Sequence, residues 1–224
     1  MNQPATPGER LAPPTMLYRF AVECRRFGGQ WKPGQGVALL PKHRIPVFSQ
    51  LDERPVFAEV RAGWAEAGLF VMIEVRGKQQ SIWCRPTRLL ESDGLQLWID
   101  TRDTHNIHRA SRFCHWFVCL PGGGGSRRDE PLASMLKINR ARDFPRTFGS
   151  AAPQVATRMY RDGYRLAVLV PAASLDGWNP AEHRKLGFSY AIADRELGWQ
   201  TLATGPEFPV AEDPALWHTL ELVD

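Results

Sequence analysis

The sequence predicts an all-β protein: a single antiparallel β-sandwich, of the jelly-roll or immunoglobulin-like kind, with one long insertion loop. Three observations lead to this prediction. Apolar and polar residues alternate with period two in several short stretches, which is typical of strands with one face in a core. Glycines and prolines, 19 and 18 in number, separate these stretches. No stretch keeps a helical period, and the chain has no visible internal repeat.

The N-terminal half begins with a proline-rich segment. Residues 1–15 contain four prolines and no apolar run of the kind found in secretory signals, so we expect a disordered lead followed by one domain over residues 16–224. Alternation predicts a first strand at residues 18–25, and short strands are expected at residues 37–40 and 56–62. Residues 69–75 are apolar on both faces apart from Glu74, which predicts a central strand.

The second half begins with the most informative strand, at residues 93–100. Gln96, Trp98 and Asp100 share one face of this strand, and the apolar residues between them share the other. The pattern predicts one face in the core and one face available to a ligand. Further strands are expected at residues 112–120, 164–170, 186–194 and 216–223, which makes about nine in all. Between them, residues 121–156 are expected to form an insertion loop with a short helix over residues 132–142.

Composition and charge limit the classes of partner. The longest apolar run, residues 69–75, is far shorter than the roughly 18 to 20 residues of a membrane helix, so no membrane contact is expected. In the absence of a signal peptide we expect a cytoplasmic protein. Residues 101–165 carry 12 Lys and Arg against 5 acidic residues, whereas residues 166–224 carry 3 against 9. The basic segment could meet an acidic protein partner, but no nucleic-acid-binding motif accompanies it.

The four cysteines are expected to be reduced and mostly buried. Cys114 and Cys119 lie on one predicted strand, where they would be roughly 16 Å apart and on opposite faces. That separation is too large for a disulfide, which needs Cα atoms within about 7 Å of each other.

Three separated pieces of the chain resemble the family-nine carbohydrate-binding modules and the related DOMON-like ligand-binding sandwiches. They are residues 93–100 (Asp-Gly-Leu-Gln-Leu-Trp-Ile-Asp), residues 164–171 (Tyr-Arg-Leu-Ala-Val-Leu-Val-Pro) and residues 187–194 (Gly-Phe-Ser-Tyr-Ala-Ile-Ala-Asp). The resemblance covers residues 56–223. It implies a β-sandwich that holds a sugar between aromatic rings, often with calcium in a structural role, although the fold also hosts haem binders. Apart from a possible structural calcium, we expect no cofactor. Gln96 and Ala167 depart from the acidic residues that the family often has at these positions.

The sequence therefore favours a non-catalytic binding domain for a glycan or another small polar ligand. The chain has eight tryptophans, and an indole offers a flat apolar surface to the C–H face of a sugar while amide and guanidinium groups bond to its hydroxyls. Trp98 and Gln96 are the best pair of candidates. The remaining candidates are a second ring, from Trp116 or Trp83, and two residues of the loop rim, Arg112 and His105.

Two alternatives belong to other functional classes. The first is a protein-interaction or assembly module that uses the basic middle segment. The second is a metal-dependent hydrolase, for which the only group with metal-ligand chemistry is Asp100, Asp103, His105, His108 and His115. No His-Glu-x-x-His, Cys-x-x-Cys or Gly-x-Ser-x-Gly motif accompanies this group. The absence of a convincing catalytic or metal-binding set favours a binding protein over an enzyme.

Overall fold

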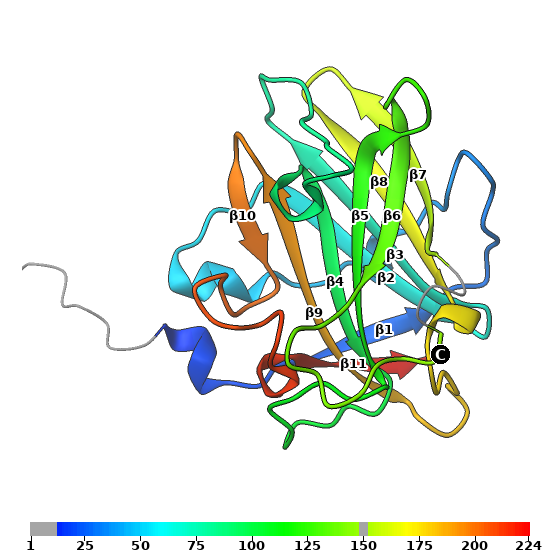
Figure 1. The fold of residues 1–224 in the computed structure, drawn as a ribbon, viewed down its shortest axis with the longest axis vertical. Coiled ribbons are helices and arrows are strands. Elements are labelled where there is room, and N and C mark those ends of the chain that lie inside the picture. Colours follow the sequence, from blue (N-terminus) through cyan, green and yellow to red (C-terminus); the bar gives the residue numbers. More distant parts are fainter. Residues whose placement is uncertain (1–12, 148–151) are drawn as a thin grey trace, which may run out of the picture.

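Two facing layers of β-strands form the molecule (Figure 1). The computed structural model describes residues 13–147 and 152–224. Within these residues the regular elements are strands and short 3-10 turns, without an α-helix. Eleven strands join into one continuous sheet that folds over on itself. The expected all-β sandwich is confirmed.

The strands are β1 (Ala21–Arg26), β2 (Ala58–Ala65), β3 (Gly68–Arg76), β4 (Gly94–Asp100), β5 (Cys114–Gly124), β6 (Glu130–Leu136), β7 (Gln154–Tyr160), β8 (Gly163–Pro171), β9 (Lys185–Asp194), β10 (Gly198–Thr201) and β11 (His218–Val223). Their order in the sheet is β6-β5-β4-β9-β11-β1-β2-β3-β8-β7, and β10 pairs with β9. The central position predicted for residues 69–75 is confirmed, because β3 lies between β2 and β8.

One strand makes the sandwich mixed rather than purely antiparallel. β1 runs parallel to both of its neighbours, β11 and β2, whereas all the other pairs are antiparallel. Parallel neighbours cannot be joined by a tight hairpin. The first strand therefore pairs with the last strand of the chain on one side, and reaches β2 on the other only after a connection over residues 27–57.

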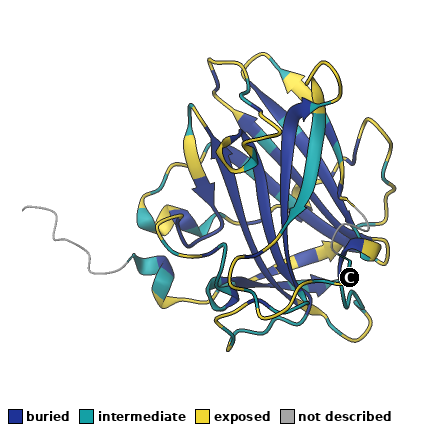
Figure 2. Cartoon of the chain, in the orientation of Figure 1, coloured by how far each residue is buried: buried dark blue, intermediate teal, exposed yellow. Residues whose placement is uncertain are grey.

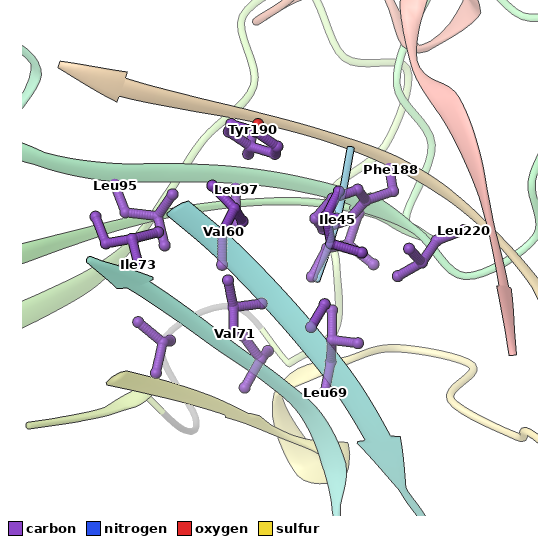
Figure 3. Packing of buried hydrophobic residues seen from close by; sticks show 14 of the residues in the cluster. Ile45, Val60, Leu69, Val71, Ile73, Leu95, Leu97, Phe188, Tyr190 and Leu220 are labelled. Carbon is purple, nitrogen blue, oxygen red and sulfur yellow. The ribbon is translucent and has the colours of Figure 1, made fainter. Parts of the chain in front are cut away.

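The core fills the space between the layers. Figure 3 shows Leu69, Val71 and Ile73 of β3 facing Leu95 and Leu97 of β4 across this space. These side chains are fully buried, and the strands are buried along most of their length while the connecting loops are exposed (Figure 2). Burying one such side chain stabilises the fold by about 1.5–3 kcal/mol.

The prediction of a strand at residues 37–40 is wrong. Val37 and Leu39 are buried, but they belong to a loop that packs on the outer face of β3 and β8. The loop approaches β8 so closely that a Cβ atom on Gly36 would lie 2.6 Å from the Cβ of Ala167. The alternating pattern of these residues reflects a loop buried on one side, not a strand in a ladder.

The insertion loop expected at residues 121–156 is also corrected. This range contains the end of β5, all of β6 and the start of β7. The short helix expected over residues 132–142 is absent, because residues 132–136 continue β6 and pair with β5. The glycine run at residues 122–125 leads into the turn between the two strands, with a register shift between Leu120 and Gly124.

The predicted N-terminal lead falls largely on residues 1–12, which lie outside the described residues. Its last residues are described and take part in the fold. Pro14–Leu17 form a 3-10 turn, and the buried Thr15 donates hydrogen bonds from its backbone N–H and its hydroxyl to the carboxylate of Asp52. Among the described residues there is no helix of the length and hydrophobicity that a membrane crossing requires.

Candidate functional site

A pocket lies on the outer face of the layer formed by β10, β9, β4 and β5. Its volume is about 270 Å³. Strand register creates its floor: Leu95, Leu97 and Ile99 of β4 point into the core, so the residues between them must point outward. The expected division of this strand into a core face and a second face is confirmed.

The floor of the pocket contains Gln96, Trp98 and Trp116. Trp98 of β4 pairs directly with Trp116 of β5, and their rings stack with centroids 5.8 Å apart and planes inclined by 22°. The two residues are only 4% and 7% exposed, because the segment at residues 203–217 packs over them. Trp217 fixes this segment by donating its indole N–H to the carbonyl of Val210 at 2.7 Å.

Hydrogen-bonding capacity is left unused at this floor. The indole Nε1 atoms of Trp98 and Trp116 are buried and have no acceptor in the described part of the chain. No hydrogen bond to another described side chain or backbone group engages the amide of Gln96 either. A buried polar group without a partner costs about 1–3 kcal/mol. The two indole nitrogens have almost no exposed surface, so among these groups the amide of Gln96 is the one that a ligand in the pocket would reach.

The rim adds an exposed aromatic residue that the sequence analysis missed. Trp199 of β10 is 39% exposed and Leu90 is 42% exposed, and both line the pocket. Thr201 and Thr204 contribute hydroxyl groups, and none of the described side chains lining the pocket is charged. One signal in the sequence could have identified Trp199. It lies a few residues after the strand predicted at residues 186–194, and a hairpin there would bring it back beside that strand, opposite Ala193.

Three of the predicted site residues lie elsewhere. Trp83 is half-buried and packs among arginines outside the pocket. The guanidinium of Arg112 lies over the ring of Phe113, 4.8 Å from its centroid. His105 bonds to Thr219 at 3.0 Å and to Asp103 at 2.8 Å. Of the six candidates, the pocket therefore brings together Gln96, Trp98 and Trp116.

The histidines of the hydrolase alternative do not converge. His108 is exposed and pairs with Asp213 at 3.0 Å. His115 faces the interior, where its Nε2 accepts the backbone N–H of Asp176 at 2.8 Å, and burial lowers its pKa to about 4. No group of three or more metal-ligating side chains occurs in residues 13–147 and 152–224.

Calcium does not fit the main buried acidic cluster. The Nζ atom of Lys78 lies 2.7 Å from both oxygens of Asp194 and 3.2 Å from Asp93. Burial lowers the pKa of Lys78, but its hydrogen bonds to Asp194 and the charge of Asp93 outweigh burial and raise the pKa above its ordinary value. Backbone N–H groups also bond to both carboxylates. Calcium takes six to eight oxygen ligands, whereas here the lysine ammonium and backbone N–H groups already occupy the carboxylate oxygens.

Comparison with known proteins supports the fold. No protein-family model matches the chain, and no curated protein sequence matches it either. Among solved structures, the chain is similar to a family-nine carbohydrate-binding module from Caldicellulosiruptor kristjanssonii in complex with glucose. The TM-score is 0.63 at 12% identity, over 91% of this chain and 95% of the module. The complex of such a module from the same organism with cellotriose gives a TM-score of 0.61 at 12% identity, over 91% and 94%.

A Bacteroides uniformis protein that has been suggested to bind carbohydrate is similar as well. Its TM-score is 0.53 at 10% identity, over 92% of this chain and all of that protein. At these identities the similarity concerns the fold. The resemblance to family-nine modules drawn from the sequence is thus confirmed at the level of architecture.

Proposed function

We propose that this protein is a non-catalytic binding domain whose pocket takes one neutral sugar ring. One observation carries the proposal: a single cavity is lined by the indoles of Trp98, Trp116 and Trp199 together with the amide of Gln96. Ligand pockets commonly measure about 300–1,000 Å³. A volume of about 270 Å³ is just below this range, which favours one ring over a longer segment.

The chemistry of the pocket matches the two kinds of surface on a sugar. Ring C–H groups are apolar and would lie against the indole of Trp199 and the aromatic floor. Sugar hydroxyl groups would bond to the amide of Gln96, which can both donate and accept, and to the hydroxyl groups of Thr201 and Thr204. The lack of charged side chains among the described lining residues favours a neutral ring. The glucose and cellotriose complexes of similar folds support the same class of ligand.

The lining also supports binding without hydrolysis. Glycoside hydrolysis uses a pair of carboxyl groups on either side of the scissile bond. No Asp, Glu or His belongs to the described residues that line this pocket. A sugar held here would lie against tryptophan, threonine and glutamine side chains, none of which can act as the general acid or base of hydrolysis.

Trp199→Ala tests the proposal, because this residue is exposed and its loss should leave the fold intact. We expect calorimetry or a glycan array to find wild-type binding to neutral oligosaccharides, with glucose and cellotriose as the first probes. The variant should bind at least about tenfold more weakly, as expected for the loss of an aromatic anchor. Gln96→Leu, which keeps most of the side-chain volume, should also weaken binding.

Phe144→Ala is the matched control. Phe144 is 43% exposed but does not line the pocket, so this variant should bind like the wild type. The proposal is wrong if no neutral saccharide binds to the wild-type protein, or if Trp199→Ala binds as tightly as Phe144→Ala.

A further inference from the structure

Three arginines surround the half-buried indole of Trp83. The guanidinium carbons of Arg195, Arg85 and Arg88 lie 5.1, 5.5 and 5.8 Å from the centre of its ring. All three arginines are exposed. Each contact is within the range of a cation–π interaction, and together they concentrate positive charge around one aromatic ring. We call Trp83, Arg85, Arg88 and Arg195 the arginine cluster.

The charge of this cluster is only partly neutralised. Arg88 bonds to both carboxylate oxygens of Glu91, but Arg85 and Arg195 have no carboxylate partner among the described residues. A second group of arginines, around Tyr160, is different. There the guanidinium of Arg76 lies 3.8 Å from the ring centre, and it shares the carboxylate of Glu74 with Arg165. The arginine cluster therefore has guanidinium groups free to bind an anion.

A buried ionic network holds the cluster in place. One carboxylate, that of Asp93, accepts the backbone N–H of Trp83 at 3.0 Å and the backbone N–H of Arg195 at 2.8 Å. Lys78 in turn binds Asp93 and Asp194. Burying such charges is costly unless their hydrogen bonds are well satisfied. Here these bonds join two loops that are far apart in sequence and fix the backbone at the cluster.

The cluster also lies beside the mouth of the pocket. Arg88 directly precedes the 3-10 turn Leu89–Glu91, and Leu90 of this turn lines the pocket. Arg195 belongs to the hairpin that leads into β10, whose Trp199 lines the opposite part of the rim. The turn and β10 therefore both border the same pocket, through Leu90 and Trp199. A ligand that extends from the pocket past Leu90 or past the turn before β10 would approach the arginines.

We propose that the arginine cluster binds the carboxylate of a uronic acid, so that the natural ligand is an acidic glycan with one neutral ring in the pocket. This inference rests on the proposed function for the position of that ring. Arg85 and Arg195 would bond to the carboxylate oxygens, and guanidinium groups suit this role because they donate two parallel hydrogen bonds. Trp83 would offer its ring to the sugar that carries the carboxylate.

The test compares cellotriose with its counterpart in which the C6 hydroxymethyl group of one terminal ring is oxidised to a carboxylate, so that neutral rings remain for the pocket. We expect calorimetry at low salt to show about tenfold tighter binding of the acidic form to the wild-type protein, with the advantage shrinking as salt is raised. Arg195→Gln and Arg85→Gln should each remove most of this advantage while leaving cellotriose binding unchanged.

Arg158→Gln is the matched control. Arg158 is also exposed and lies 5.7 Å from the centre of an aromatic ring, that of Tyr160, so this variant loses the same charge outside the arginine cluster. It should keep the preference for the acidic saccharide. The proposal is wrong if the wild type binds both saccharides equally, or if Arg158→Gln loses the preference as Arg195→Gln does.

Inorganic sulfate separates this inference from the proposed function. Sulfate alone should give a saturable shift of the Trp83 indole resonance in the NMR spectrum, and Arg195→Gln should weaken it. If sulfate produces this shift while no saccharide binds, the sugar pocket is refuted and the anion site stands. If cellotriose binds but neither sulfate nor the acidic saccharide engages Trp83, the anion site is refuted and the sugar pocket stands.

Discussion

At the level of single residues, the burial of His115 makes the stability of the fold depend on pH. It lies on the core face of β5, parallel to the ring of Phe117. Because its Nε2 accepts the N–H of Asp176, the proton of the neutral ring is on Nδ1, which faces the carbonyl of Ile99 at 3.4 Å. Burial lowers the pKa of His115 from 6.5 to about 4, and burial likewise lowers the pKa of His218 to about 4.

We predict that the free energy of unfolding decreases as the pH falls from 6.5 to about 4. In this range the unfolded chain binds protons at these histidines and the folded chain does not, so acid favours unfolding. The free energy of unfolding keeps its full value above pH 6.5. The decrease that protonation causes reaches at most about 3 kcal/mol for each histidine. Urea unfolding at a series of pH values measures it.

The variant His115→Gln tests this assignment. Glutamine retains an acceptor near the N–H of Asp176 but does not titrate, so His115→Gln should show a shallower dependence on pH. Equal slopes for His115→Gln and the wild type would contradict the assignment.

The sequence could place a candidate residue in the site where that residue lies on a strand with clear alternation. Gln96 and Trp98 follow from the pattern of β4 alone, and Trp116 lies opposite Trp98 in the register. Trp83 and Arg112 were placed in the site because of their residue types. Residue type does not determine which side of a loop a side chain occupies, and the structure puts both residues outside the pocket.

At the level of elements, β10 depends on one buried glutamine. Gln200 accepts the backbone N–H groups of Phe57 and Ala58, each at 2.8 Å, and donates to the carbonyl of Ala58 at 2.9 Å. These bonds join β10 to the start of β2 across the interior. They hold a strand of only four residues in position and therefore also fix Trp199 and Thr201 at the pocket.

Gln200→Ala should destabilise the fold by about 2–4 kcal/mol, because it leaves buried backbone groups without partners. The same variant should weaken saccharide binding, since β10 contributes part of the pocket. Chemical denaturation and calorimetry measure the two effects. Gln154→Ala, at an exposed position of β7, should change neither. A Gln200→Ala protein as stable as the Gln154→Ala protein would show that these bonds do not anchor β10.

The strands that sequence located with the clearest pattern share one property: they are buried on at least one face along most of their length. β3, β4, β8 and β9 are of this kind. β6 and β7 are partly exposed edge strands, and β10 has four residues. Their residues give weak alternation, so their existence depends on pairing with neighbours rather than on their own pattern.

On the scale of the whole molecule, the four thiols report on global stability. Cys24, Cys84, Cys114 and Cys119 are free and buried, which confirms the expected reduced state. Cys114 and Cys119 lie in different apolar clusters on opposite faces of β5. Burial raises the pKa of the Cys84 and Cys114 thiols to about 12, so the reactive thiolate is scarce at neutral pH.

We expect a thiol reagent to modify the folded protein very slowly and to modify all four cysteines once the chain is unfolded. Because reaction requires opening of the core, its rate at a fixed pH should increase with urea in proportion to the unfolded population. Absorbance of the released chromophore measures both quantities. Fewer than four reactive thiols after unfolding would indicate a disulfide, and rapid reaction of the folded protein would indicate an open core.

The sequence by itself determined the fold class, the faces of the buried strands and the pair Gln96 and Trp98, because alternation along one strand is a local property. Tertiary structure decided the rest. It placed β1 between β2 and β11, folded residues 203–217 over Trp98 and Trp116, and brought Trp199 to the rim. It also gathered Trp83, Arg85 and Arg195 around the buried Asp93. Such contacts join residues far apart along the chain, and no local pattern encodes them.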